Sequence, residues 1–336
     1  MEKFSLSLFT LFASALLTAV SLPVLRRFAA KRLQDKPSPL KKFTAPLLGG
    51  PAIFVATNIT LVIIRFITNF PTGTLHRLRG ILMGGALIFC LGLLDDLRKP
   101  KGLPMPLKLL VQMTATGALI FYGVHIEVIS APWASYPFTF VWILALTNAF
   151  NLLDIQDGLC VSQAVVCALG LVLITLPSEF IYVNFGALAL LGACLAFWPT
   201  NHAKEKIFLG DSGATFLGFM VAALCMGAGY SKHVSYGFLA PLFIVAVPLF
   251  DTFFVSVARL LKGKNPLKGS DDHLALRLSR SGYSQKKILM AFLMAAVLCN
   301  VAAFIVTCAP ANVVICLFIL AGGALGYILK RGLSCK

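Results

Sequence analysis

Aspartate and asparagine side chains gather in a few short motifs at the ends of long apolar segments. The clearest motif is TNAFNLLDIQDGL, where Asn148, Asn151, Asp154 and Asp157 stand three residues apart. This spacing predicts one slowly turning polar stripe on a helix, with Gly158 suited to end the helix. Asparagines alone could hold helices together inside a membrane, but two carboxylates favour a site for a metal ion or a substrate.

Three further motifs carry acidic residues beside apolar runs. GLLDDLRKP contains the adjacent Asp95 and Asp96, which are stable together only beside cations or with one carboxyl protonated; a helix end in water is the alternative interpretation. In KIFLGDSGATFLGF, Asp211 or Ser212 could cap a helix, and the glycines could let a phosphate approach the N-terminus of that helix. In PLFDTFFVSVARLL, Asp251 lies inside an apolar run, and we expect it to pair with a cation or to support the site.

Two basic stretches accompany the acidic motifs. RLLKGKNPLKGSDDHLALRLSRSGYSQKK contains His273, Arg277 and Arg280, which could bind a pyrophosphate by charge-assisted hydrogen bonds. Such a loop is also what the cytoplasmic side of a membrane protein normally carries. KPSPLKKFTAPLLGG could bind anionic lipid headgroups or a nucleotide, and its pattern does not decide between them.

Composition indicates which elements position these motifs. Hydrophobic residues make up 58% of the 336-residue chain and charged residues only 12%, more apolar surface than a water-soluble protein could bury. We predict an all-α, polytopic integral membrane protein with about 11 transmembrane helices, or alternatively about 10. The predicted spans are 4–22, 46–66, 80–94, 106–124, 137–153, 159–176, 181–199, 213–229, 238–258, 288–308 and 312–329.

The basic residues are divided unequally between the two sides of the membrane. One side, which includes Lys108 and the C-terminus, holds 24 of the 29 lysines and arginines. The positive-inside rule makes this side cytoplasmic, with the N-terminus outside and the C-terminus inside. We therefore expect one transmembrane catalytic domain, residues 1–336, with its site at the cytoplasmic face of the inner membrane. The predicted cytoplasmic loops are 23–45, 95–105, 200–212 and 259–287.

The net charge of +16 is explained by cytoplasmic loops and anionic headgroups, so we predict no nucleic-acid partner. Most of the acidic residues lie on or near the cytoplasmic ends of the predicted spans. Carboxylates there suit Mg²⁺, which is usually bound by a few carboxylates together with phosphate oxygens of a substrate. Composition and spacing thus indicate a Mg²⁺ site for a phosphate-rich substrate at the membrane surface.

The motifs PLLGG, GLLDDLRK, NAFNLLDIQDGL, FLGDSGATFLGF and PLFDT occur in this order along nearly the whole chain. This order resembles the polyprenyl-phosphate N-acetylhexosamine-1-phosphate transferases (MraY/WecA/TagO-like, glycosyltransferase family 4), and PLLGG resembles the WecA/TagO branch. The resemblance implies that a UDP-linked amino sugar, most simply UDP-GlcNAc, gives its sugar-1-phosphate to undecaprenyl phosphate and releases UMP. This would begin cell-wall or surface-polysaccharide synthesis, with Mg²⁺ as cofactor and Mn²⁺ as the alternative.

The resemblance also implies roles for individual residues. The aspartate pair matches residues thought either to deprotonate the lipid phosphate or to hold metal and substrate. A lipid phosphate has a low pKa, so we expect Asp95 mainly to position it. The implied catalytic residues are Asp95, Asp96, Asp154 and His273, and the implied metal ligands are Asp211 and Asp154. The substrate-binding set is Lys41, Lys42, Lys108, Asn151, Asp157, Asn201 and Phe208, to which the motif patterns add Asn148 and Arg277.

Two positions depart from the family pattern. The family usually has Gly after the first aspartate of the DGxDG motif, but Ile155 follows Asp154 here, and we expect ordinary helix because Ile does not readily adopt a positive φ. The family's late histidine motif, often H-H-H or H-x-H-H, reads HLAL here, with His273 followed by Leu276 and Arg277. These departures bear on the sugar more than on the reaction.

Three alternatives remain beside the main hypothesis. A phospho-MurNAc-pentapeptide transferase of peptidoglycan synthesis would use the same reaction with another sugar. An ion-coupled transporter would carry its polar residues at mid-span, whereas these lie at one end. A catalytically silent scaffold would not need the retained carboxylates. The expected partners are a UDP-sugar, polyprenyl phosphate and the membrane, and a homodimer is left open.

Overall fold

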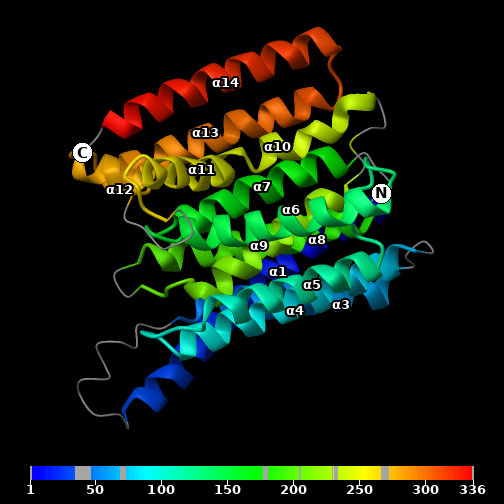
Figure 1. Ribbon diagram of the computed structural model, residues 1–336. Coiled ribbons are helices and arrows are strands. Elements are labelled where there is room, and N and C mark those ends of the chain that lie inside the picture. Colours follow the sequence, from blue (N-terminus) through cyan, green and yellow to red (C-terminus); the bar gives the residue numbers. More distant parts are fainter. Residues whose placement is uncertain are drawn as a thin grey trace. The chain divides into compact units, whose positions relative to one another are not determined.

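The computed structural model describes residues 2–34, 47–68, 73–176, 181–203, 206–228, 230, 234–265 and 272–334. Within these ranges every regular element is a helix, and eight helices are long and apolar enough to cross a bilayer. This confirms the predicted class of an all-α, polytopic membrane protein. The chain divides into two compact units, unit 1 (Met1–Ala228) and unit 2 (Gly229–Lys336), which we describe separately (Figure 1).

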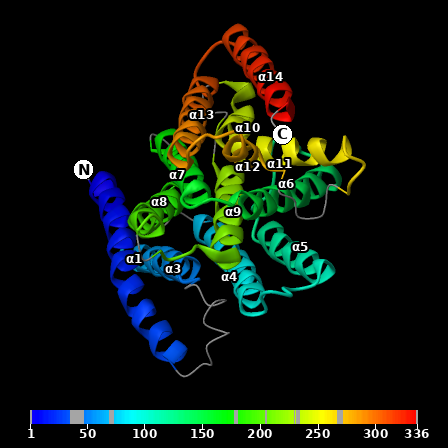
Figure 2. The same cartoon turned by 90° about the vertical axis from the view of Figure 1, so that its left-hand side faces the viewer.

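Unit 1 is built around one central helix. Helix α9 packs against α4 and α6, and α3, α7 and α8 also contact it (Figure 2). Its sequence GDSGATFLGFMVAALCMG is small and apolar on all sides, as expected for a helix that is buried all round. The described helices of unit 1 are α1 (Glu2–Gln34), α3 (Gly49–Ile67), α4 (Thr74–Leu97), α5 (Met105–Phe121), α6 (Pro132–Leu153), α7 (Leu159–Thr175), α8 (Ile181–Asn201) and α9 (Gly210–Gly227).

Two glycines let neighbouring helices approach the start of α9 at backbone distance. A Cβ atom on Gly92 of α4 would lie 2.5 Å from the Cα atom of Ser212, and one on Gly50 of α3 would lie 2.4 Å from the backbone nitrogen of Gly213. Small residues at helix contacts are typical of membrane proteins, where close backbone packing drives helix association. These contacts place the C-terminal end of α4 beside the N-terminal end of α9.

Unit 2 contains a broken span. The predicted span 238–258 is not one straight helix, because α10 and α11 are separated at Val245 and bent by 67°. Pro248 explains the break, since a proline ring clashes with the carbonyl four residues earlier, here that of Ile244, the last residue of α10. The described helices of unit 2 are η1 (Ser235–Leu239), α10 (Ala240–Ile244), α11 (Ala246–Leu260), α12 (Leu274–Arg280), α13 (Gln285–Val306) and α14 (Ala311–Ser334).

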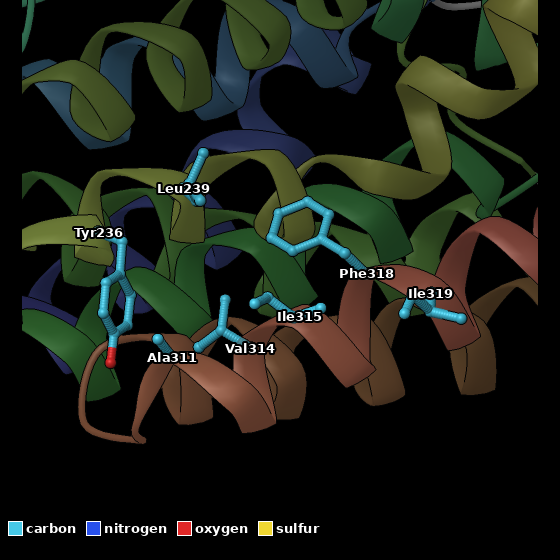
Figure 3. A pocket seen from close by; sticks show the side chains of 7 residues that line it. All are labelled: Tyr236, Leu239, Ala311, Val314, Ile315, Phe318 and Ile319. Carbon is cyan, nitrogen blue, oxygen red and sulfur yellow. The ribbon is translucent and has the colours of Figure 1, made fainter.

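An apolar hollow of ≈ 490 Å³ lies between η1 and the N-terminal part of α14 (Figure 3). Leu239, Val314 and Phe318 are among its walls, and none of its seven lining residues is charged. The hydroxyl of Tyr236 donates a hydrogen bond to the carbonyl oxygen of Ala309 at 2.6 Å. The hollow therefore suits hydrocarbon rather than a phosphorylated group.

Several helix boundaries differ from the predicted ones. Helix α1 continues to Gln34, so residues 23–34 of the predicted first loop are helical. Helix α4 begins before the predicted span 80–94 and continues past it to Leu97. Helices α5 and α7 are apolar but have only 17 residues each, at the lower limit for crossing a bilayer, so the number of spans stays a prediction.

The loop after α4 and the loop before α9 lie at one end of unit 1, where Lys99 contacts Asp211. Single cysteines introduced by Pro100→Cys and Ala203→Cys into a cysteine-free chain should therefore react from the same side, which the positive-inside rule predicts to be the cytoplasm. The control Val128→Cys, in the α5–α6 loop at the other end, should react only from outside. Labelling of position 100 or 203 from outside intact cells would contradict the predicted topology.

Candidate active site

The end of α4 and the start of α9 bring Asp95, Asp96 and Asp211 together, although Asp96 and Asp211 are 115 residues apart in the chain. The two carboxylate oxygens of Asp96 accept the backbone N–H groups of Asp211 and Ser212, each at 2.9 Å. These amides lie in the first turn of α9, where a helix has no internal acceptors to offer. Asp96 therefore caps α9 from a neighbouring helix.

This cap corrects two predictions made for the α9 motif. Neither Asp211 nor Ser212 caps the helix, because the N-cap residue is Leu209 and no side chain of the motif accepts the first amides. The backbone N–H groups of Asp211 and Ser212, at the helix N-terminus predicted to receive a phosphate, instead donate to the Asp96 carboxylate. Gly210, with φ +75°, makes the contact possible, since a Cβ atom there would lie 2.7 Å from the Asp96 carboxylate.

Asp95 is fixed on the other side of the cluster. Its carboxylate accepts the backbone N–H of Leu103 and forms an ion pair with Lys108 of α5. It also lies within hydrogen-bonding distance of the Asp211 side chain. Two acidic side chains in contact need a shared proton or a nearby cation, because two bare carboxylates repel one another.

Lys99 supplies one such cation. Its Nζ atom lies 3.0 Å from Oδ1 of Asp96 and 2.9 Å from Oδ1 of Asp211. Burial alone would lower the pKa of Lys99, but its hydrogen bonds and ion pairs with Asp211 and Asp96 outweigh burial and raise that pKa above its ordinary value. Lys99 was assigned no role from the sequence. The available signal was its position three residues after Asp96, a spacing at which helical side chains meet.

The α6–α7 connection is a turn rather than a continued helix. Helix α6 ends at Leu153, Asp154 is its C-cap, and residues 154–158 form turns. Gly158 is the left-handed N-cap of α7, with φ +76°. The predicted helical stripe through Asp157, the ordinary helix at Ile155 and the helix stop at Gly158 are therefore wrong. Ile155 does keep a negative φ, as its branched side chain requires.

The carboxyl of Asp154 interacts electrostatically with Asp211 and Lys99 of the same cluster. Desolvation of its carboxyl raises the pKa of Asp154, the negative charge of Asp211 raises it further and Lys99 opposes this, which together bring it to about 7. At neutral pH this carboxyl is therefore about half protonated. A divalent cation could displace that proton, since a metal binds the deprotonated carboxylate.

The segment before α9 holds this turn in place. Lys206 forms an ion pair with Asp157. The side-chain oxygen of Asn201 accepts the backbone N–H of Gly158, and its amide group donates to the carbonyl oxygen of Ile207 at 2.9 Å. Asn201 is only 4% exposed, so it joins two loops of the site from within. Its predicted contact with a substrate stays a prediction.

Phe208 follows in the same segment, and its side chain is 36% exposed. Its carbonyl oxygen accepts the backbone N–H of Gly49 at 3.0 Å, which fixes the start of α3 beside the site. The exposed ring is open to a ligand, as the predicted nucleoside contact requires. Lys41 and Lys42, also predicted to bind substrate, lie outside the described residues.

The two asparagines of α6 differ in their surroundings. Asn148 donates to Oε1 of Gln112 on α5 at 3.3 Å and to the carbonyl oxygen of Leu144 at 2.7 Å. This is the helix-to-helix contact that was the alternative interpretation of the motif. Asn151 lies one turn nearer to Asp154 and is half-buried. A substrate role for either residue stays a prediction.

Unit 2 carries a separate polar cluster. The Nδ1 atom of His273 lies 2.7 Å from Oδ2 of Asp251, and both side chains are 2% exposed. Arg277 pairs with Asp272 at 3.0 Å and donates to the carbonyl oxygen of Gly332 at 3.2 Å. Asp251 thus has a histidine as its partner, and its pairing with a cation stays a prediction. The catalytic role of His273 and the substrate role of Arg277 stay predictions, and here both side chains bind within unit 2.

The donor set of unit 1 fits Mg²⁺ without forming a closed metal cage. Within the ranges that the structure describes, no three His, Cys, Asp or Glu side chains converge as such a cage. Mg²⁺ does not need one, since one or two carboxylates, water molecules and substrate phosphates usually complete its shell. The contact between Asp95 and Asp211, with Asp154 in the same field, is a place where a cation would relieve charge repulsion.

Comparison with known proteins finds a matching family model and several relatives. Residues 78–229 match the model of Glycosyl transferase family 4. The probable undecaprenyl-phosphate N-acetylglucosaminyl 1-phosphate transferase of Bacillus subtilis (strain 168) is 29% identical over 289 residues, which cover 82% of this chain and 78% of that protein. The undecaprenyl-phosphate alpha-N-acetylglucosaminyl 1-phosphate transferase of Escherichia coli (strain K12) is 27% identical over 342 residues, 94% of this chain and 89% of that protein.

A third relative is the decaprenyl-phosphate N-acetylglucosaminephosphotransferase of Mycolicibacterium smegmatis, 27% identical over 277 residues, or 73% of this chain and 68% of that protein. The segment that matches the family model contains Asp95, Asp96, Asp154 and Asp211, so the matched region coincides with the acidic cluster of unit 1. Residues 78–229 are therefore similar to glycosyl transferase family 4, and the relatives above are similar to this chain over a larger part of its length.

Proposed function

We propose that this chain transfers N-acetylglucosamine-1-phosphate from UDP-GlcNAc to a polyprenyl phosphate such as undecaprenyl phosphate, and releases UMP at the cytoplasmic face of the inner membrane. One observation carries the proposal: carboxylates from α4, the α6–α7 turn and α9 meet at one end of a helical membrane unit, among lysines. Relatives that are named for N-acetylglucosamine transfer support this sugar over a MurNAc-pentapeptide.

The reaction makes modest covalent demands on the protein. An oxygen of the lipid phosphate attacks the β-phosphorus of the UDP-sugar, the bond from that phosphorus to the bridging oxygen of UMP breaks, and UMP leaves with the electron pair. Catalysis of phosphoryl transfer consists mainly of alignment and neutralisation of oxygen charge. Mg²⁺ bound by Asp211 and Asp154 would supply part of that neutralisation. Lys99, Lys108 and Lys206 supply further positive charge at the site.

The hydrogen bonds separate the roles of the adjacent acids. Asp95 is held by the Leu103 amide and by Lys108, and it faces Asp211, which suits it to position the attacking phosphate. Asp96 uses both carboxylate oxygens on the amides of α9, so it positions Asp211 rather than meeting the reactants. A strong general base is not needed, because the lipid phosphate is already ionised at neutral pH.

The purified full-length chain, mixed with undecaprenyl phosphate, Mg²⁺ and a panel of UDP-sugars, should release UMP with UDP-GlcNAc and only when the lipid phosphate is present. The panel should include UDP-MurNAc-pentapeptide, and the Escherichia coli relative serves as the positive control. UMP release with the pentapeptide alone would favour the other sugar. A lack of release with every donor, while the control is active, would overturn the proposed reaction.

Asp211→Asn should reduce Mg²⁺-dependent UMP release by roughly 100-fold or more, since removing one charged group at a phosphoryl-transfer centre costs at least this much. The amide keeps the shape of the side chain, so the thermal unfolding temperature should change little. Glu127→Gln, an acidic position in the α5–α6 loop at the other end of unit 1, is the matched control and should keep normal activity. Near-normal activity of Asp211→Asn would exclude Asp211 from the metal site.

Cation binding should depend on pH through Asp154. Because the pKa of Asp154 is about 7, the carboxyl is mostly protonated at pH 6 and mostly ionised at pH 8. Only the ionised form binds a metal, so the apparent affinity for Mn²⁺ should rise roughly 10-fold between these pH values and level off above them. Titration of free Mn²⁺ by electron paramagnetic resonance measures this. Asp154→Asn should bind more weakly with a flatter pH profile, and an unchanged profile would remove Asp154 from the cation site.

A further inference from the structure

Three lysines form ion pairs with the acidic side chains of the site, and they differ in the carboxylates with which they pair. Lys108 pairs with Asp95, which the Leu103 amide also fixes, and Lys206 pairs with Asp157. Lys99 instead bridges Asp96 and Asp211, so it is the one of the three that contacts the proposed metal ligand. Its side chain is 43% exposed, so it is not fully enclosed by the protein.

The position of Lys99 conflicts with a metal ion on the same oxygen. Its Nζ atom lies 2.9 Å from Oδ1 of Asp211. A divalent cation bound to that carboxylate would stand within a few ångströms of the ammonium group, and like charges at that distance repel strongly. Lysine is a flexible point charge on a four-carbon stem, so it can turn away at little cost. A cation bound to Asp211 would therefore displace Lys99 from this carboxylate.

An ammonium group released from Asp211 would be available to another anionic group, such as a phosphate oxygen. If a pyrophosphate completed the shell of a cation held by Asp211, its oxygens would be within reach of the flexible Lys99 side chain. We propose that Lys99 is an exchangeable counterion: it neutralises Asp211 before the divalent cation binds, and it then binds a phosphate oxygen of the nucleotide donor. This inference rests on the proposed function, and it adds a residue that orders cation binding before donor binding.

The proposal predicts that one substitution strengthens cation binding and weakens binding of the nucleotide donor. Lys99→Gln removes the competitor for Asp211, so the cation should bind more tightly, by roughly 3-fold to 10-fold. The same change removes a charge-assisted contact to phosphate, so the KM for UDP-GlcNAc at saturating Mg²⁺ should rise roughly 10-fold. A purely structural role for Lys99 would weaken both cation and donor binding. A purely repulsive role would change cation binding alone.

The experiment compares the wild-type full chain with Lys99→Gln, Lys99→Arg and Lys101→Gln. Lys101 lies two residues further along the same loop, is exposed and serves as the matched control, with no change expected in either quantity. Lys99→Arg keeps the charge and should restore donor binding. Binding of Mn²⁺ is measured by electron paramagnetic resonance without lipid or donor, so it does not depend on turnover. Unchanged or weaker cation binding in Lys99→Gln, or an unchanged KM, would overturn the proposal.

A measurement on the wild-type protein covers the case in which the Gln variant does not fold. The amine of Lys99 is labelled with an acylating reagent and quantified by mass spectrometry. Labelling should rise by at least roughly 2-fold when Mg²⁺ is added and fall again when UDP-GlcNAc follows, because an ammonium group held by carboxylates reacts slowly. If the extent of Lys99 labelling did not change when Mg²⁺ was added, the proposal would be overturned. If the wild type releases no UMP, the proposed function fails, while the Mg²⁺ response still tests the competition for Asp211.

Discussion

The site in unit 1 depends on the hydrogen bonds between the Asp96 carboxylate and the first amides of α9. The first amides of a helix have no partner within the helix, and Ser212 is buried from solvent, so leaving its amide unpaired is costly. Asp96 satisfies them with a negative charge at the positive end of the helix dipole. This contact fixes α4 against α9 and thereby sets Asp95 face to face with Asp211.

The cap is possible only because the helices come unusually close. Gly92 lets α4 lie against the backbone of α9, and Gly50 does the same for α3. Close packing of small residues makes α9 a rigid central element, with Asp211 in its first turn. The charged groups consequently lie at one end of the bundle, where a water-soluble nucleotide and the phosphate of a lipid can meet.

The carboxylates of this cluster would repel one another strongly if no cations lay beside them. Lys99, Lys108 and Lys206 each form an ion pair with part of this negative charge. The pKa of Asp154 is raised first by desolvation of its carboxyl and then by the negative charge of Asp211. In the function proposed above, a divalent metal and the oxygens of phosphate groups would bind here. In unit 2, the buried pair of Asp251 and His273 is a further polar element, held by its own helices.

The sequence by itself determined the helical membrane class and the acidic motifs, and it carried the resemblance to a family, because hydropathy and motif order can be read directly from the chain. It also contained Pro248, whose effect on the ninth span could have been recognised. Only the tertiary structure decided that Asp96 caps α9, that Asn148 bonds to Gln112, and that Lys99 bridges two acids. These contacts join segments far apart in the chain, and side-chain geometry rather than residue spacing selects them.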